Sequence, residues 1–162
     1  MGEGSPRRGG IVFRGTYSVG LDAKGRLAIP ARFRERLLSS DISRLVFTPD
    51  PDNCLVLYPE PDWILIEQKL QQLPSFNKSA RDLKRLLIGS AHDVDMDAQG
   101  RVLLPQKLRA LAGLDKRVAM VGQINKIEIW DEEQWQLQQD RRKDSIDLDD
   151  LAADADLASL IL

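Results

Sequence analysis

The sequence predicts an α+β protein built from a duplicated unit, and three observations lead to this prediction. The segment 22–34, DAKGRLAIPARFR, aligns without gaps to 97–109, DAQGRVLLPQKLR, with six identical positions in thirteen. Short β-rich runs alternate with helix-like patterns in both copies. The composition, 43% hydrophobic and 30% charged, is typical of a chain that buries a core. We therefore expect two related domains with short helices.

Each copy is expected to begin with a strand, a tight turn and a second strand. In the first copy the strands run over about 16–22 and 26–29, and the turn between them closes a hairpin. Asp22 can accept hydrogen bonds from the amides that follow it, and Gly25 supplies the positive φ of the turn. Asp97 and Gly100 take the same places in the second copy, so these four residues are predicted to shape the turns.

A short helix and a further hairpin follow each turn. Pro30 and Pro105 are expected to open the helices, since proline lacks the N–H that a first turn leaves unpaired, and Gly113 to end the second. The hairpins pair the β-rich runs 44–48 with 54–58 and 118–122 with 126–130. Two linking helices are expected over about 61–72 and 77–89, the second capped by Asn77.

These elements divide the chain into five segments. We expect an N-terminal extension, a first domain, linking helices, a second domain and an acidic C-terminal tail, over 1–12, 13–60, 61–89, 90–143 and 144–162. The extension is either a basic arm or the product of an upstream start codon. The tail is either frayed and weakly helical, or a helix that orders only against a partner.

Charge is distributed unevenly along the chain. Residues 1–36 carry a net charge of +5, residues 37–130 are balanced, and residues 131–162 carry −7, which leaves −2 overall. A basic front and an acidic tail suggest that the front binds a polyanion. A solvated charged surface is the plainer interpretation of the same pattern.

Several classes of protein are excluded or disfavoured. No apolar run approaches the roughly 20 residues of a membrane span and no secretion signal is evident, so we expect a cytoplasmic protein without membrane contact. The single cysteine, Cys54, is expected to be buried in a strand. With Cys54 and one histidine, His92, the chain lacks the ligands of common metal motifs, so no metal, cofactor or small-molecule substrate is expected.

The repeated turn has a structural and a functional interpretation. Structurally, the aspartate caps the turn, the glycine closes it, and the arginine pairs with the aspartate. Functionally, the first turn can present Lys24, Arg26 and Arg14 together, whereas the second offers Arg101 beside a neutral Gln99. Arginine can bind the two acceptors of guanine or grip a phosphate, which favours double-stranded DNA as the partner. One turn makes few contacts, so a homo-oligomer would be needed to multiply them.

The strings FRGTYSVGLDAKGRLAIPARFR (13–34), RLLIGSA (85–91), DAQGRVLLP (97–105) and VGQINKIEIWDEEQW (121–135) together resemble the bacterial MraZ family. The resemblance implies tandem AbrB/SpoVT-like, β-barrel-type domains, each marked by a D-x-x-x-R motif. It also implies a nucleoid-associated transcriptional regulator, a ring-shaped homo-oligomer that binds short direct repeats upstream of the division and cell-wall gene cluster.

Carried over by position, the motifs fall at Asp22 to Arg26 and at Asp97 to Arg101. The resemblance implies that Arg26 contacts DNA with Lys24 beside it, and that both aspartates brace their turns. It leaves open whether the second turn also contacts DNA.

Two other functions remain as alternatives. The first is an oligomeric protein-interaction scaffold without DNA binding, in which the turns are structural and the tail or the apolar helices recruit partners. The second is an enzyme using acidic pairs such as Asp93 with Asp95 or Asp149 with Asp150. Their alternating or tail positions favour solvated carboxylates, so we expect no enzyme.

Overall fold

The computed structural model describes residues 11–154, which fall into two compact units divided after Glu132. The elements of the first repeat and the linker are β1 (Phe13–Gly20), β2 (Arg26–Ala28), α2 (Ala31–Ser39), β3 (Arg44–Pro49), β4 (Leu55–Pro59), α3 (Glu60–Gln71) and α4 (Lys78–Leu87). Those that follow are β5 (His92–Asp95), β6 (Arg101–Leu103), α5 (Gln106–Leu111), β7 (Arg117–Ile124), β8 (Ile127–Asp131), α6 (Glu132–Ser145) and α7 (Leu148–Ala153).

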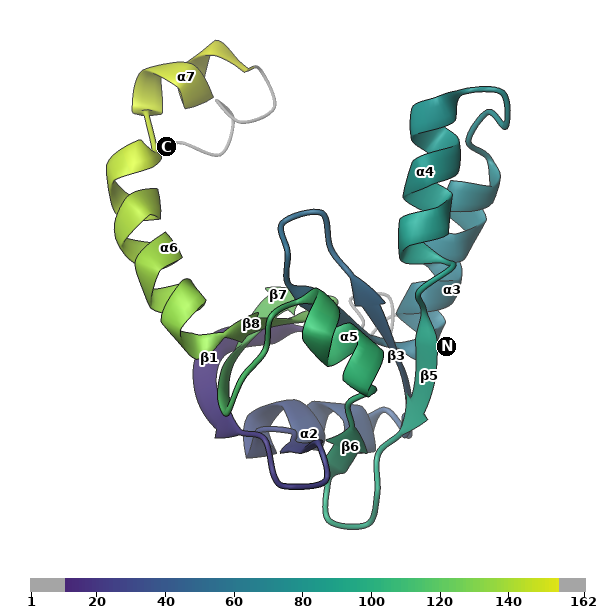
Figure 1. The fold of residues 1–162 in the computed structure, drawn as a ribbon, viewed down its shortest axis with the longest axis vertical. Coiled ribbons are helices and arrows are strands. Elements are labelled where there is room, and N and C mark those ends of the chain that lie inside the picture. Colours follow the sequence, from purple (N-terminus) through teal and green to yellow (C-terminus); the bar gives the residue numbers. More distant parts are fainter. Residues whose placement is uncertain (1–10, 155–162) are drawn as a thin grey trace, which may run out of the picture. The chain divides into compact units, whose positions relative to one another are not determined.

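The strands of the two repeats combine in shared sheets (Figure 1). One antiparallel sheet has six strands in the order β1-β7-β8-β4-β3-β5, and β2 pairs with β6 in a separate two-stranded ribbon. The predicted α+β class is therefore confirmed. The barrel implied by the resemblance is not confirmed, because the six-stranded sheet is open and ends at β1 and β5.

Equivalent positions of the two repeats face each other across these pairings. In the ribbon, Leu27 lies opposite Val102, its own counterpart at the offset of 75. In the sheet, β4 and β8 pair around Val56 and Glu128, which are counterparts at the offset of 72. A strand pair centred on equivalent residues implies a local two-fold relation between the repeats.

The expected hairpin at the first turn needs correction. β1, before the turn, pairs along its whole length with β7, and β2, after the turn, pairs with β6. The two segments are joined directly by an isolated bridge between Leu21 and Leu27 and by a hydrogen bond from the N–H of Asp22 to the carbonyl oxygen of Arg26 at 3.1 Å. The turn therefore connects the sheet to the ribbon, and its flanking strands take their main partners from the other repeat.

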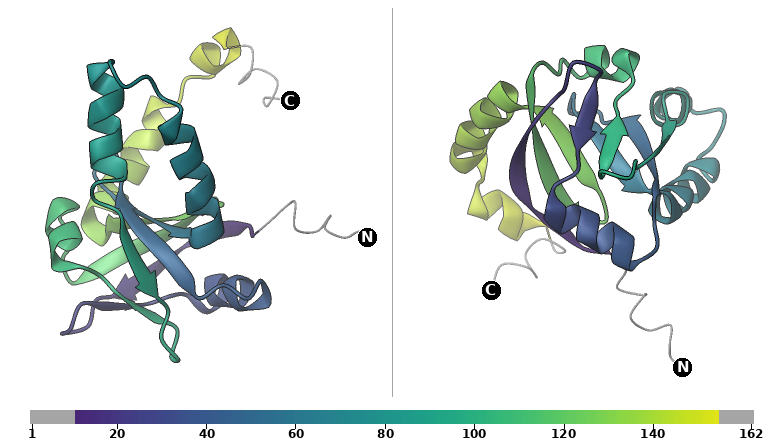
Figure 2. Two further views of the ribbon diagram at one scale, coloured as in Figure 1. Left: turned by 90° about the vertical axis from the view of Figure 1, so that its right-hand side faces the viewer. Right: turned by 90° about the horizontal axis from the view of Figure 1, so that it is seen from below.

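The sheet is covered on both faces, which explains why its central strands read as continuous apolar runs. On β3, Leu45 and Phe47 enter the main core, whereas Val46 packs in a smaller cluster with Trp63 of α3. Helix α2 contributes Phe33 to the main core. α2 and the α3–α4 hairpin thus lie on opposite sides of the strands (Figures 1 and 2).

The helix boundaries follow the expected local signals. Pro30 and Pro105 directly precede α2 and α5, and the side chain of Asn77 accepts a hydrogen bond from the backbone N–H of Ala80 at the start of α4. Gly113 has φ of +63° shortly after α5. These observations confirm the expected signals at the helix ends. Such signals can be predicted from sequence because they involve only the backbone groups of a few neighbouring residues.

The second unit contains most of α6 together with α7. The carboxylate of Asp147 accepts a hydrogen bond from the N–H of Asp149 at the start of α7, so part of the acidic tail is helical. Residues 1–10 of the expected extension and 155–162 of the tail lie outside the described residues. Cys54 is buried in the first unit, as predicted, but it directly precedes β4 and is not part of the strand.

Candidate nucleic-acid interface

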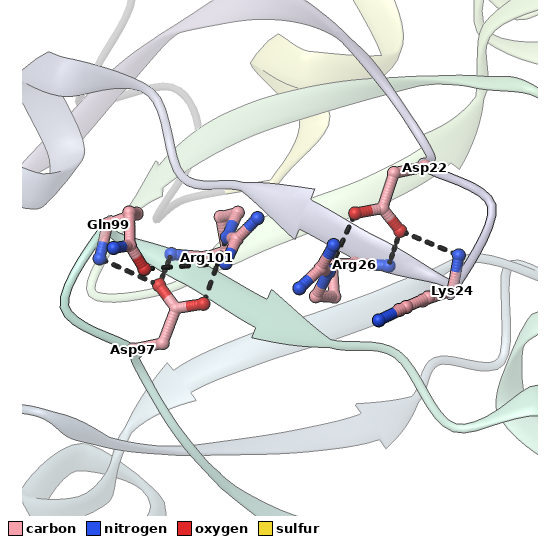
Figure 3. Close-up of polar contacts among 6 residues, drawn as sticks. All are labelled: Asp22, Lys24, Arg26, Asp97, Gln99 and Arg101. Atoms are coloured by element: carbon pink, nitrogen blue, oxygen red, sulfur yellow. Dashed lines mark hydrogen bonds and ion pairs between the residues drawn. The ribbon is translucent and has the colours of Figure 1, made fainter.

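The two repeated turns lie at the ends of the β2–β6 ribbon (Figure 3). Leu27 and Val102 point to one face of the ribbon and are buried in the core, which anchors it. Arg26 pairs with Leu103, and Ala28 pairs with Arg101. Because opposed residues point to the same face and side chains alternate along a strand, these four residues share the other, outward face.

Asp22 organises the first turn through several hydrogen bonds. Its Oδ1 accepts from the backbone N–H groups of Lys24 at 2.9 Å and Arg26 at 2.8 Å. Its Oδ2 accepts from Nε of Arg26 at 2.7 Å. Gly25 donates its N–H to the carbonyl oxygen of Asp22 at 3.0 Å and has φ of +83°, which glycine adopts without strain.

The second turn repeats this arrangement. Oδ1 of Asp97 accepts from the N–H groups of Gln99 at 2.9 Å and Arg101 at 2.8 Å, and Oδ2 accepts from Nε of Arg101 at 2.9 Å. Gly100 has φ of +78°. The turn-shaping geometry expected for both aspartates and both glycines is therefore present.

Hydrogen bonding lowers the pKa of both aspartates. The pKa of Asp22 is lowered, first by the hydrogen bond from the backbone of Arg26 and also by the side chain of that arginine, while desolvation opposes the shift. The pKa of Asp97 is lowered in the same way by Arg101. Both carboxylates are therefore ionised at neutral pH and hold their arginines by charge-assisted hydrogen bonds.

The arginines pair with their own aspartates but are not buried by them. The side chains of Arg26 and Arg101 are 30% and 31% exposed. Within residues 11–154, Nη1 and Nη2 of Arg26 make no hydrogen bond, whereas Nη2 of Arg101 donates to Oε1 of Gln99 at 3.3 Å. The aspartate thus fixes one edge of the Arg26 guanidinium and leaves its two terminal nitrogens available to a ligand.

The cations beside the two turns differ. Lys24 is exposed and forms no ion pair with any residue in the described part of the chain, whereas Gln99 at the equivalent position uses its amide on Arg101. Arg14 is not brought to this site. It lies near the start of β1, six residues before Gly20, which corresponds to about 20 Å of extended strand.

Each turn is also supported by the other repeat, which the sequence did not indicate. Leu104 donates its N–H to the carbonyl oxygen of Gly25, and Ile29 donates to that of Gly100, both at 2.9 Å. Arg34 lies against Gly100, where a Cβ would overlap its side chain.

Beside the first turn, Gln106 and Arg109 join Lys24 in lining a cavity of about 170 Å³. Arg34 and Arg109 form one of the six identical pairs in the repeat. This identity is the sequence signal that could have marked both arginines as residues that contact the turns.

Other types of site find no support among the described residues. No group of three or more His, Cys, Asp or Glu side chains in residues 11–154 is arranged to hold a metal ion. None of the helices in this part of the chain is both long enough and apolar enough to cross a membrane.

Comparison with known proteins identifies the duplicated unit. Residues 12–86 and 87–157 each match the family described as "MraZ protein, putative antitoxin-like". The chain belongs to the MraZ family. The family resemblance carried by the two D-x-x-x-R motifs is thereby confirmed, and the two matched regions correspond to the two repeats.

Relatives of this family are similar over most of the chain. A protein of Nitrosospira multiformis is 56% identical over 78% of this chain and 86% of its own length. A protein of Shewanella amazonensis is 50% identical over 93% of this chain and all of its own length. A protein of Thiobacillus denitrificans is 54% identical over 78% of this chain and 86% of its own length. All three relatives are named transcriptional regulator MraZ.

Proposed function

We propose that this chain is a DNA-binding transcriptional regulator without enzymatic activity, which acts in the cytoplasm at the nucleoid. It binds short direct repeats upstream of the division and cell-wall gene cluster as a ring-shaped homo-oligomer. The observation that carries the proposal is the outward face of the β2–β6 ribbon, where two arginines are held by ionised aspartates. The name of the relatives, transcriptional regulator, supports the same function.

The chemistry of this face suits the major groove of DNA, which admits a two-stranded β-ribbon. Arg26 and Arg101 are diagonal neighbours in the ribbon, so their Cα atoms are separated by roughly 7–8 Å and their Cβ atoms by somewhat less. A guanidinium held at Nε can direct its two terminal nitrogens at O6 and N7 of guanine. Because Asp22 already restricts Arg26, binding costs less side-chain entropy than it would for a free arginine.

The first turn contributes more to binding than the second in this proposal. Lys24 adds an unpaired positive charge near the phosphate backbone, whereas Gln99 is neutral and occupies one terminal nitrogen of Arg101. The first 36 residues also carry the net charge of +5. Arg14, at the other end of β1, takes part only through a more distant phosphate.

Assembly into a ring supplies the affinity that a single ribbon lacks. Each ribbon presents few cations, and the salt-dependent part of DNA affinity scales with the number of phosphates neutralised. Several ribbons on one homo-oligomer bind repeated sites with a high effective concentration after the first contact.

The proposal is tested by measuring the affinity of the protein for a duplex with short direct repeats and for a scrambled duplex across a salt series. Arg26→Ala removes a contact worth about 1–3 kcal/mol, so the affinity for the repeats should fall by about 5- to 150-fold per engaged subunit. Arg26→Lys should keep part of the salt dependence and lose discrimination between the two duplexes, because lysine carries the charge but lacks the planar guanidinium that makes two parallel hydrogen bonds.

Arg85→Ala is the matched control, because Arg85 is an exposed arginine on α4 that also pairs with an aspartate, Asp82, at 3.0 Å. Its affinity for DNA should equal that of the wild type. Unchanged affinity in Arg26→Ala would remove the mechanism. A wild-type oligomer with no salt-dependent DNA binding would instead favour the scaffold function.

A further inference from the structure

We propose that a groove between the start of β5 and helix α5 binds the acidic C-terminal segment, residues 144–162, of a second copy of the chain. The inference rests on the proposed function in one respect, that the protein acts as a homo-oligomer. It adds the surfaces through which one subunit contacts the next.

The groove has a volume of about 350 Å³ and a mainly apolar lining. Ala91, Pro105, Leu108 and Leu111 contribute this lining, and Leu111 is 54% exposed although it is a large apolar residue. The volume is within the range of about 300–1,000 Å³ typical of ligand pockets. An apolar cavity with an exposed leucine is the kind of surface that another apolar side chain covers.

The polar groups of the groove favour an acidic occupant. Lys107 and His92 are among its lining residues, and no carboxylate of the described chain is. Lys107 forms no ion pair with any residue between 11 and 154. Helix α5 (Gln106–Leu111) contains two basic residues and no acidic one. A segment that carries both negative charge and apolar side chains therefore matches this surface.

The C-terminal segment has this composition. Residues 144–162 contain six aspartates and no lysine or arginine, together with isoleucines and leucines spaced through the segment. Part of it forms α7, and Ile146 just before this helix is 63% exposed. An amphipathic helix laid in an apolar groove is a common mode of peptide recognition.

The second copy follows from the geometry of rings. A ring is closed by contacts in which two different surfaces of the same chain meet, repeated around the assembly. The groove and the acidic segment are two such surfaces of the same chain. The apolar side chain of Leu111 is not repeated at the equivalent place in the first repeat, where the counterpart at the offset of 75 is the charged Arg36.

Substitutions on the two surfaces of the full-length chain test the proposal, with native mass and sedimentation as the measurements. Lys107→Glu should raise the concentration needed for half-assembly by about fivefold or more, since it replaces an attraction by a repulsion. Asp149→Lys combined with Asp150→Lys should have a similar effect. Combining all three substitutions in one chain should restore assembly, because the charges are then exchanged.

Leu111→Gln tests the apolar part of the groove and should also weaken assembly. Leu38→Gln is its matched control: Leu38 is 59% exposed on α2 and lies outside the groove, so its substitution should leave the mass unchanged. Circular dichroism of each variant verifies that the fold is retained.

A mixing experiment distinguishes a second copy from the same chain. Leu111→Asp disables the groove and Leu151→Asp disables the segment, so each variant alone should be monomeric. Mixed together, they retain one intact groove and one intact segment, and a 1:1 dimer should form. If the charge substitutions altered the sedimentation of the chain without any change in its native mass, the segment would dock on its own chain. That result would overturn the proposal.

The inference and the proposed function can fail separately. A wild-type oligomer whose mass none of these substitutions alters would overturn the docking surface alone and leave the DNA-binding proposal intact. A monomeric wild type would overturn both the docking surface and the proposed ring, and the DNA titration would then decide whether the ribbon binds DNA.

Discussion

The carboxylates of Asp22 and Asp97 each perform two tasks in their turns. One oxygen accepts backbone N–H groups and so fixes the path of the chain, and the other holds Nε of the arginine four residues later. The structural interpretation of the motif, in which the arginine pairs with the aspartate, is therefore correct. It does not exclude the functional one, because the pairing directs the guanidinium and leaves it partly exposed.

The lowered pKa values predict how the turns respond to acid. The pKa of Asp22 is lowered by hydrogen bonds from Arg26, so its stabilising effect is present above the ordinary Asp pKa of about 3.9. That effect is lost as the pH falls through the lower pKa of the folded state. In a carboxyl-carbon NMR titration, Asp22 and Asp97 should titrate below the ordinary value.

Asp22→Asn keeps an oxygen for the backbone but loses the ionised partner of Arg26. This variant should remove the low-pH titration at position 22 and leave that of Asp97 in place. It should also shift the Nε resonance of Arg26 to that of a free guanidinium. A titration of Asp22 at its ordinary pKa would contradict the hydrogen bonding described for the turn.

The residues of the turns could be predicted from sequence because Asp and Gly act through local backbone geometry. Arg34, Gln106 and Arg109 could not be assigned to the site in the same way. They reach the turns across the two-fold relation between the repeats, and no local pattern specifies which segment lies opposite.

At the scale of elements, the positions of strands and helices were more predictable than their partners. The runs 44–48 and 118–122 were expected as strands and lie within β3 and β7. Periodicity reveals that a segment is extended and apolar, but not which strand it pairs with. The pairing of β1 with β7 therefore emerges only from the structure.

The pairing of β1 with β7 depends on close backbone contact at Gly122. A Cβ at this position would overlap the backbone of Phe13 and Arg14 in β1. Gly122→Ala should therefore force the two strands apart and lower the free energy of unfolding by about 1–3 kcal/mol, the usual cost of overpacking. Urea unfolding measures the change.

Gly20→Ala is the matched control at the other end of the same ladder. A Cβ at Gly20 would meet mainly Nη1 of Arg117 at 3.3 Å, and this flexible, exposed side chain can move away. The control should change stability by only a few tenths of a kcal/mol. Equal losses in both variants would show that the close approach at Gly122 is unimportant.

At the scale of the first unit, the two repeats are intertwined. The main core draws on both, with Phe13 and Phe33 from the first and Val118 and Met120 from the second. Each of the ladders β1–β7, β2–β6, β3–β5 and β4–β8 joins one repeat to the other. The duplication was visible in the sequence, but this exchange of strands was not, because an internal repeat specifies similarity and not contact.

This arrangement predicts that neither half folds alone as a monomer. A chain divided between α3 and α4, into residues 1–75 and 76–162, separates every one of these ladders into two fragments. At low concentration each fragment alone should lack protected amides in hydrogen exchange, and an equimolar mixture should recover the protection of the intact chain. Protection in either monomeric fragment would contradict the dependence of the core on both repeats.

The joining of the two turns in one polypeptide has a consequence for any ligand that lies along the ribbon. A pair of identical chains would carry the same side chain at both equivalent positions, but here Lys24 stands at one end and Gln99 at the other. The surface therefore has a polarity, and a strand reversed end for end would meet different chemistry. Fusion of the two repeats in one chain thus permits recognition of the direction of a ligand strand. A symmetric pair of chains with one repeat each could not distinguish the two directions.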